Sequence, residues 1–209
     1  RMVQVLQNRS FVTQDSETDG YVLTDQLFQM AMKQPRMQSL TEIALPVMRH
    51  LATIIGQSCH IAIHANAESV VVVRMESDEQ IGYSVRIGYR STILRTGSGE
   101  VLFAFQPDDV REHWLGHLPA KTERRVIDEF VARANATRKR GHLSKPSTFV
   151  QGITDLAAPI MRGDRAAAAL AIPFVGHAEV RRSIEETVEK LVAAAESISS
   201  QLVDADNRI

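Results

Sequence analysis

The stretch "DLAAPIMRGDRAAAALAIPF" (residues 155–174) decides the fold class of this chain. It holds two apolar segments on either side of a turn at Arg162-Gly163-Asp164. Two strands joined by so short a turn lie antiparallel. Upstream, residues 58–65 ("SCHIAIHA") alternate apolar and polar side chains, which predicts a half-buried strand. Residues 69–75 ("SVVVVRM") form a continuous β-branched run, which is typical of a strand buried on both faces.

Residues 82–90 ("GYSVRIGYR") predict a third strand that ends near Gly88. Helical spacing of apolar residues predicts helices over residues 40–55, from about Gly97, from Pro107, over residues 122–140 with Val126 and Phe130 facing inward, and over residues 184–202. Strands and helices do not alternate one for one, which argues against a doubly wound parallel sheet. We therefore expect an α+β fold with an antiparallel sheet flanked by helices.

The first 32 residues differ from the rest and predict a small separate domain. Residues 1–8 have helical spacing, residues 10–24 read as a β-hairpin with Gly20 near its turn, and a short helix follows Thr24. Residues 33–39 ("KQPRMQS") are polar and contain a proline, which is typical of a linker. We expect domains at 1–32 and 40–209, joined by a linker at 33–39.

Composition excludes several classes of protein. The net charge of −1 gives no global basic field for nucleic acid, so any contact with DNA would need a local patch. A single cysteine, Cys59, allows no intrachain disulfide, and no apolar run approaches the length of a membrane span. We expect a soluble cytoplasmic protein with no membrane contact. The chain opens inside a helix, which suggests a fragment of something longer.

The stretch "RTGSGEV" (residues 95–101) offers backbone N–H groups at the start of a helix, which can hold an anion. A nucleotide-binding loop is disfavoured, because Glu100 stands where a phosphate loop needs a lysine and only Gly97 and Gly99 are present. Spacing alone leaves two interpretations open. The stretch is either a pocket for a small polar ligand or a turn into a helix.

No catalytic or metal-binding set is recognisable by spacing. His60 and His64 share a strand face, but two ligands are too few for zinc, and Cys59 points to the opposite face. We therefore expect no enzymatic activity, no metal and no cofactor. Asp155 begins an apolar strand, ten residues after Lys145, and spacing favours an exposed strand end over a polar pocket.

The chain resembles the IclR-type bacterial transcription regulators over nearly its whole length. The resemblance is carried by five stretches in order: "LQNRSFVTQDSETDGYVLT" (6–24), "LPVMRHLATIIGQSCHIAI" (45–63), "IGYRSTILRTGSGEVLFAF" (87–105), "RKRG" leading into "GITDLAAPIM" (138–161) and "AAAALAIPF" (166–174). It implies a repressor or activator with a GAF-like effector-binding domain, preceded by the end of a winged helix-turn-helix, its wing and a linker helix. It also implies homodimers or tetramers.

The resemblance implies two sets of functional residues. It implies that a small organic effector is bound by Thr96, Gly97, Ser98, Lys145, Asp155, Ala171 and Pro173. It implies that DNA is contacted from the N-terminal domain by Arg1, Gln4 and Arg9. The alternative is a GAF-like small-molecule sensor that does not act on DNA.

The chain departs from the family pattern in three places. The helices that precede the recognition helix are missing, so we expect this chain alone to bind DNA poorly. The wing tip, residues 15–20, carries three acidic residues and no basic one. Asp155 stands where the family often has a neutral residue. A carboxylate there predicts an effector with hydroxyl or amino groups, with Lys145 offsetting the charge and the N–H groups of residues 97–99 holding any carboxylate.

Overall fold

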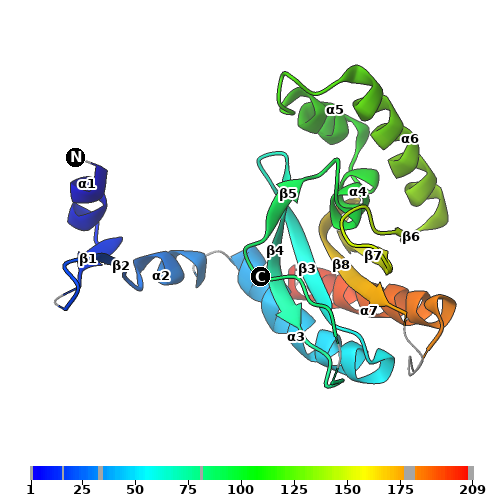
Figure 1. Ribbon diagram of the computed structural model, residues 1–209, viewed down its shortest axis with the longest axis horizontal. Helices are drawn as coiled ribbons and strands as arrows, with labels where there is room; N and C mark the ends of the chain where they lie inside the picture. Colours follow the sequence, from blue (N-terminus) through cyan, green and yellow to red (C-terminus); the bar gives the residue numbers. More distant parts are fainter. Residues whose placement is uncertain (1, 16, 33–34, 81, 177–181, 207–209) are drawn as a thin grey trace. The chain divides into compact units, whose positions relative to one another are not determined.

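The computed structural model describes residues 2–15, 17–32, 35–80, 82–176 and 182–206 (Figure 1). The chain divides into two compact units, residues 1–42 and 43–209. The second unit thus begins three residues after the expected position of 40. No helix among the described residues is long and apolar enough to cross a membrane.

The first unit contains the expected helix, hairpin and second helix. Its elements are α1 (Met2–Asn8), β1 (Val12–Gln14), β2 (Tyr21–Leu23) and α2 (Gln26–Met32). The two strands pair antiparallel, and the Asp15 N–H closes the tip by donating to the Gly20 carbonyl at 2.8 Å. Among the described residues of this tip, Asp19 has a positive φ, 55°, and Gly20 does not. The expected hairpin is therefore present, and its tip contains an aspartate with positive φ.

Helix α3 (Pro35–Ile55) begins five residues before the expected start. Residues 35–39, which were expected to be a linker, are helical, because proline is well tolerated in the first turn of a helix. Residues 33–34 lie outside the described part of the chain. The assignment of residues 1–32 to a DNA-binding domain stays a prediction.

The second unit is an antiparallel six-stranded sheet with the strand order β5-β4-β3-β8-β7-β6. The strands are β3 (Cys59–Ala65), β4 (Glu68–Met75), β5 (Arg90–Thr92), β6 (Leu143–Pro146), β7 (Ile153–Arg162) and β8 (Arg165–Val175). The long hairpin β7–β8 supplies two of the four inner strands of the sheet. Its antiparallel pairing is the one that the sequence predicts. The α+β class is confirmed.

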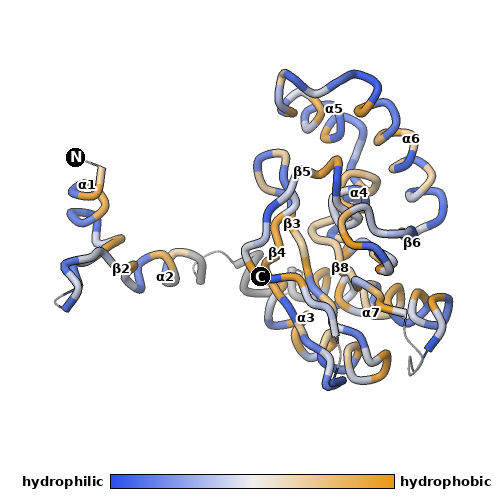
Figure 2. Tube along the Cα trace, viewed as in Figure 1, coloured by the Kyte–Doolittle hydropathy of each residue, from blue (hydrophilic) through white to orange (hydrophobic). Residues whose placement is uncertain are grey.

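The helices of the second unit are α4 (Gly97–Ala104), α5 (Asp108–Gly116), α6 (Arg124–Arg140) and α7 (Ile184–Asp206), together with the end of α3. Helices α4 and α7 contact the sheet, and α6 packs on α4. Helix α4 packs on the sheet face that carries Leu143, Ala157, Ala169 and Ala171, and α7 runs alongside β7 and β8 (Figure 1). Hydrophobic and hydrophilic residues alternate along α3 and α7, as amphipathic helices require (Figure 2).

Two expected features of the strands are wrong. Residues 82–89 form no strand, and the third strand is β5, since Gly88 adopts φ +83° and interrupts the extended backbone. This segment still follows β4: the Val71 N–H donates to the Tyr89 carbonyl at 3.0 Å, and the Gly88 N–H donates to the Val71 carbonyl at 2.8 Å. Strand β4 alternates buried and half-buried residues, so it is not buried on both faces.

Helix α6 agrees with the sequence prediction at its C-terminal end and at Phe130, but not in its first turn. It ends at Gly141, which has φ +85° and accepts the left-handed conformation that a C-cap needs. Phe130 is fully buried, as expected, and packs with Phe103 at 4.9 Å between ring centroids. Val126 was expected to face inward but is 40% exposed, because it lies in the first turn, where α6 buries no residue.

A buried carboxylate joins three elements of the second unit. Glu100, in the first turn of α4, is 3% exposed. It accepts a hydrogen bond from the Thr137 hydroxyl of α6 at 2.7 Å and another from the Lys145 ammonium of β6 at 2.5 Å. The Arg133 guanidinium of α6 lies 3.5 Å from the same carboxylate. These partners offset the cost of burying the charge.

We predict that Glu100→Gln lowers the free energy of unfolding by about 3 kcal/mol, because the change leaves the Lys145 ammonium partly buried without its counter-charge. Urea-induced unfolding measures the change. The matched control is Glu129→Gln, which removes an exposed pair with Arg125 and should cost about 0.5 kcal/mol or less. Equal losses in both variants would contradict the role assigned to Glu100.

Candidate functional site

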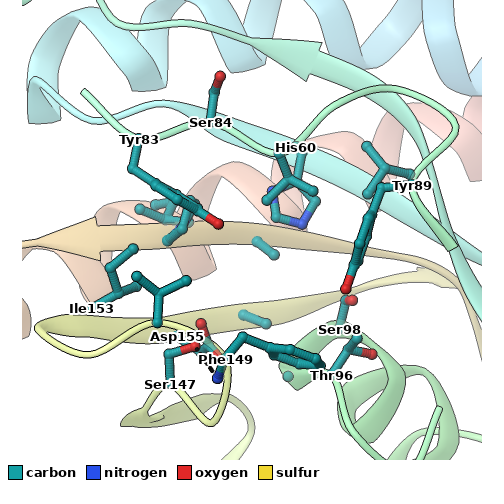
Figure 3. A pocket seen from close by; sticks show the side chains of 18 of the residues that line it. His60, Tyr83, Ser84, Tyr89, Thr96, Ser98, Ser147, Phe149, Ile153 and Asp155 are labelled. Atoms are coloured by element: carbon teal, nitrogen blue, oxygen red, sulfur yellow. Dashed lines mark hydrogen bonds between the residues drawn. The ribbon is translucent and has the colours of Figure 1, made fainter. Parts of the chain in front are cut away.

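The second unit contains a cavity of about 310 Å³ at one face of the sheet. Its walls come from strands β3, β4, β7 and β8, from the start of α4 and from the segments at residues 83–89 and 147–150 (Figure 3). This volume is at the lower end of the range for small-molecule sites. The walls combine apolar side chains with a few polar groups, as such sites usually do.

Small side chains on the central strands leave room for the cavity. The strand register places His60 of β3 beside Ala171 of β8, and Ala171 beside Ala157 of β7. Ala157 in turn pairs with Leu143 of β6. The two alanines have short side chains, so the base of the cavity is shallow between the larger side chains of His60 and Leu143. The start of α4 lines the cavity above this row. The alanine-rich run of β8 thus creates the space, because longer side chains at these positions would fill it.

The start of α4 presents free N–H groups to this space. Thr96 is the N-cap, with φ −98° and ψ 148°, and its hydroxyl oxygen accepts from the Gly99 N–H at 2.9 Å. Position 99 requires glycine, because a Cβ there would lie 2.5 Å from the Ile93 carbonyl oxygen. Among the described residues, the N–H groups of Gly97 and Ser98 have no hydrogen-bond partner. These two N–H groups, at the positive end of the helix dipole, can hold an anion.

Hydroxyl groups and one carboxylate add polarity to the walls. The Ser98 hydroxyl lies 2.9 Å from the Ser69 hydroxyl of β4, and both side chains are buried. Asp155 of β7 is half-buried, and burial raises its pKa, although the Ser147 hydroxyl and the Lys145 charge both lower it. The carboxylate is therefore held with less solvation than it would have at an exposed strand end. Spacing alone favoured that exposed end, and the structure places Asp155 in the cavity wall.

Six of the seven residues expected to bind an effector line this one cavity: Thr96, Gly97, Ser98, Asp155, Ala171 and Pro173. Lys145 is not among its lining residues, because its ammonium group bonds Glu100 instead. It pairs with Asp155 across β6 and β7 but does not offset that charge by a direct contact. Gly99 was expected to contribute an N–H group, which Thr96 already occupies.

Several lining residues were missed by sequence reasoning. His60 and Ser69 come from strands that read as ordinary core, and Tyr83, Arg86 and Tyr89 come from the segment that was expected to be a strand. A signal was present in that segment, since two tyrosines and an arginine near a glycine suit a binding loop as well as a strand. The charged lining residues among those described are Asp155 and Arg86.

The histidines and the cysteine are not arranged as a metal site. His60 lines the cavity just described, whereas His64 stacks on Trp114 at 3.5 Å between ring centroids and lines a second cavity with His113. Burial raises the pKa of the Cys59 thiol to about 12, so this thiol is a poor nucleophile. Within the described residues, no group of three or more His, Cys, Asp or Glu could hold a metal ion.

The residues expected to contact DNA lie in the first unit. Gln4 is on α1 and Arg9 follows it, and both are exposed. Arg1 lies outside the described residues. Their contact with DNA stays a prediction.

Comparison with known proteins places the chain in a family. The family model described as "Bacterial transcriptional regulator IclR C-terminal" matches residues 33–200. The chain belongs to the IclR family of transcriptional regulators. The match covers the sheet, its helices and the cavity, so the GAF-like α+β domain is the IclR effector-binding domain.

Individual IclR relatives cover most of the chain. It is 25% identical to the transcriptional regulator KdgR of Escherichia coli, over 97% of this chain and 79% of the relative. It is 29% identical to the glycerol operon regulatory protein of Streptomyces coelicolor, over 76% and 63% of the two chains. An IclR homologue of Microbacterium hydrocarbonoxydans, solved with 4-hydroxybenzoate, has a TM-score of 0.75 at 23% identity and covers 97% of this chain and 83% of its own. That likeness shows the shared fold.

We predict that acidification destabilises this IclR domain through the buried His60 and the half-buried His64. Burial lowers the pKa of both His60 and His64 to about 4, with the charge of His113 adding to the effect at His64. The unfolded chain binds protons near pH 6.5 and the native state only near pH 4, so the free energy of unfolding should fall as the pH drops between those values.

Urea unfolding at pH 7.5, 6.0 and 5.0 measures this loss. The variant His60→Phe should lose less stability on acidification than the wild type, because one of the two groups is gone. The matched control is His50→Gln, which replaces an exposed histidine and should follow the wild-type curve. Asp155 has the opposite effect on stability. Its pKa is raised in the native state, so the native state binds this proton more readily than the unfolded chain does, and acidification increases the free energy of unfolding through this group. An unchanged pH dependence in His60→Phe would exclude His60 as a source of the effect.

Proposed function

We propose that residues 43–209 bind a small organic acid in the cavity, and that binding alters how the winged unit at the N-terminus engages DNA. The observation that carries this proposal is the convergence of six expected effector-binding residues on one cavity of suitable size. Family membership supports the same function. The alternative, a GAF-like sensor without a DNA target, is less favoured because residues 12–23 form the hairpin that is expected of the wing of a DNA-binding unit.

The cavity favours a hydroxylated carboxylic acid. The N–H groups of Gly97 and Ser98 attract a carboxylate, and Arg86 adds a positively charged side chain to the lining of the same cavity. Asp155 repels a second carboxylate and accepts hydrogen bonds from a hydroxyl or amino group. The complex of an IclR homologue with 4-hydroxybenzoate, which is also a hydroxylated acid, supports this class of effector.

The mechanism is a shift between conformational populations and involves no chemistry on the ligand. An effector that binds one arrangement of the domains more tightly increases the population of that arrangement. In a homodimer or tetramer, that shift changes the spacing of the DNA-reading units, so effector affinity and DNA affinity are coupled. Lining residues arranged as a nucleophile with its base are not found among those described. The proposal therefore treats the effector as a signal.

We predict that an effector stabilises the protein and changes its affinity for operator DNA. A thermal-shift screen against hydroxy acids, simple carboxylic acids, aromatic acids, amines and sugars identifies it. A ligand at a hundred times its Kd adds about 2.7 kcal/mol to the free energy of unfolding. Fluorescence anisotropy of operator DNA with the full-length protein then measures the change in DNA affinity, which must also weaken with salt. A stabilising ligand without any effect on DNA would favour the sensor alternative.

We predict that Asp155→Ala weakens binding of a hydroxylated effector at least tenfold. The lost hydrogen bond involves a charged group and is worth about 1.5–3 kcal/mol. Isothermal titration calorimetry with the best hydroxy acid of the screen measures the Kd. Asp155→Asn should lose less, because the amide oxygen still accepts a hydrogen bond. Unchanged affinity in Asp155→Ala would remove Asp155 from the binding site.

A further inference from the structure

A buried histidine in the cavity wall lacks a hydrogen-bond partner. His60 is 8% exposed, and its Nδ1 atom has no partner among the described residues. Its ring projects from β3 into the cavity (Figure 3). More than nine in ten buried polar groups in proteins have a partner, and leaving one without a partner costs about 1–3 kcal/mol. The missing hydrogen bond of His60 in the cavity wall therefore calls for an explanation in terms of function.

The groups around His60 do not supply that partner. Its neighbours across the sheet are Ala171 on β8 and Arg74 on β4, and the next residue beyond Ala171 is Ala157 of β7. The alanine side chains cannot form a hydrogen bond, and the Arg74 guanidinium lies 3.3 Å from the Glu76 carboxylate and is not bonded to the His60 Nδ1. The Ser69 hydroxyl of β4 is bonded to that of Ser98. The titratable side chains in the walls are otherwise Asp155 of β7 and Tyr83, Arg86 and Tyr89 of the segment after β4. No hydrogen bond joins any of these four to His60 among the described residues.

We propose that His60 recognises an uncharged oxygen of the effector, a hydroxyl or a carbonyl, and so makes the site selective for hydroxy or keto acids over acids that lack this oxygen. This inference rests on the proposed function, and it assigns to His60 a role that is separate from those of Asp155 and the α4 N-terminus. An effector oxygen that reaches the ring gives the imidazole a hydrogen bond that none of the described residues supplies. Selectivity follows, because an acid without the oxygen leaves the imidazole unpaired.

The oxygen that meets His60 is uncharged for two reasons. The effector carboxylate already has the N–H groups of Gly97 and Ser98, which offer the positive end of a helix. In addition, burial keeps the His60 imidazole neutral, with its pKa lowered to about 4. A carboxylate against this ring would favour its charged form and draw a proton from solvent. A neutral imidazole has one donor and one acceptor nitrogen, which suits a hydroxyl in particular.

Calorimetric titration with two matched acids tests the proposal. D-gluconate and hexanoate share a six-carbon chain and a carboxylate, and only gluconate has hydroxyl groups. The wild-type protein should bind gluconate at least tenfold more tightly than hexanoate at pH 7.5. His60→Phe should reduce that ratio at least tenfold by weakening gluconate alone, and His60→Gln should restore part of it. The control His64→Phe alters a histidine of the same strand that lines the second cavity and should leave the ratio unchanged.

A second readout follows the proton of His60. Titration of the wild-type protein with gluconate in two buffers of different ionisation enthalpy should show no proton uptake that His60→Phe removes between pH 6 and pH 7.5. Uptake of a proton in the wild type that is lost in His60→Phe would overturn the proposal of an uncharged oxygen, since it would place a carboxylate against His60 and not a proton on Asp155.

The remaining outcomes separate this inference from the proposed function. Equal affinity of the wild type for the two acids would overturn the selectivity, and an unchanged ratio in His60→Phe would overturn the role of His60. Both results leave effector binding intact. No binding of gluconate at millimolar concentration, while another class of the thermal-shift screen binds, overturns the hydroxy-acid class. No binding in any class of the screen overturns the proposed function as well.

Discussion

The buried ion pair between Glu100 and Lys145 is the constraint on which the second unit depends. The carboxylate belongs to the first turn of α4, and its partners belong to α6 and β6. A charge buried to this degree is tolerated only while its partners stay in place, so it fixes the position of the α4 N-terminus relative to the sheet edge. The N–H groups of Gly97 and Ser98 are aimed at the cavity as a result.

The cavity itself follows from side-chain size and strand register. Ala157 and Ala171 lie side by side on adjacent strands and leave space above the sheet. Glycine at 97 keeps that space open next to Asp155, because a Cβ there would lie 3.2 Å from the Asp155 Cβ. Polar groups then enter from separate elements, with His60 on β3, Asp155 on β7 and the N–H groups on α4. No single segment of the chain contains the site.

Sequence reasoning succeeded where local patterns decide the structure. The β7–β8 hairpin and the cap at Gly141 depend on residues close together in the chain. It failed where distant partners decide. The ammonium group of Lys145 lies near two carboxylates, those of Asp155 and Glu100. Only the three-dimensional structure shows that it bonds Glu100. His60 reads as one polar residue of a half-buried strand, and its unpaired state depends on neighbours from β4, β7 and β8.

The same ion pair resolves an apparent conflict at the site. Glu100 follows the N–H groups of Gly97 and Ser98 by only two or three residues, and its charge alone would repel an anionic effector from the helix start. Lys145 and Arg133 lie against the carboxylate and compensate that charge locally. The helix dipole and the free N–H groups then still attract a carboxylate. Under the proposed function, Lys145 therefore supports effector binding from outside the cavity, by keeping the charge of Glu100 from opposing the ligand.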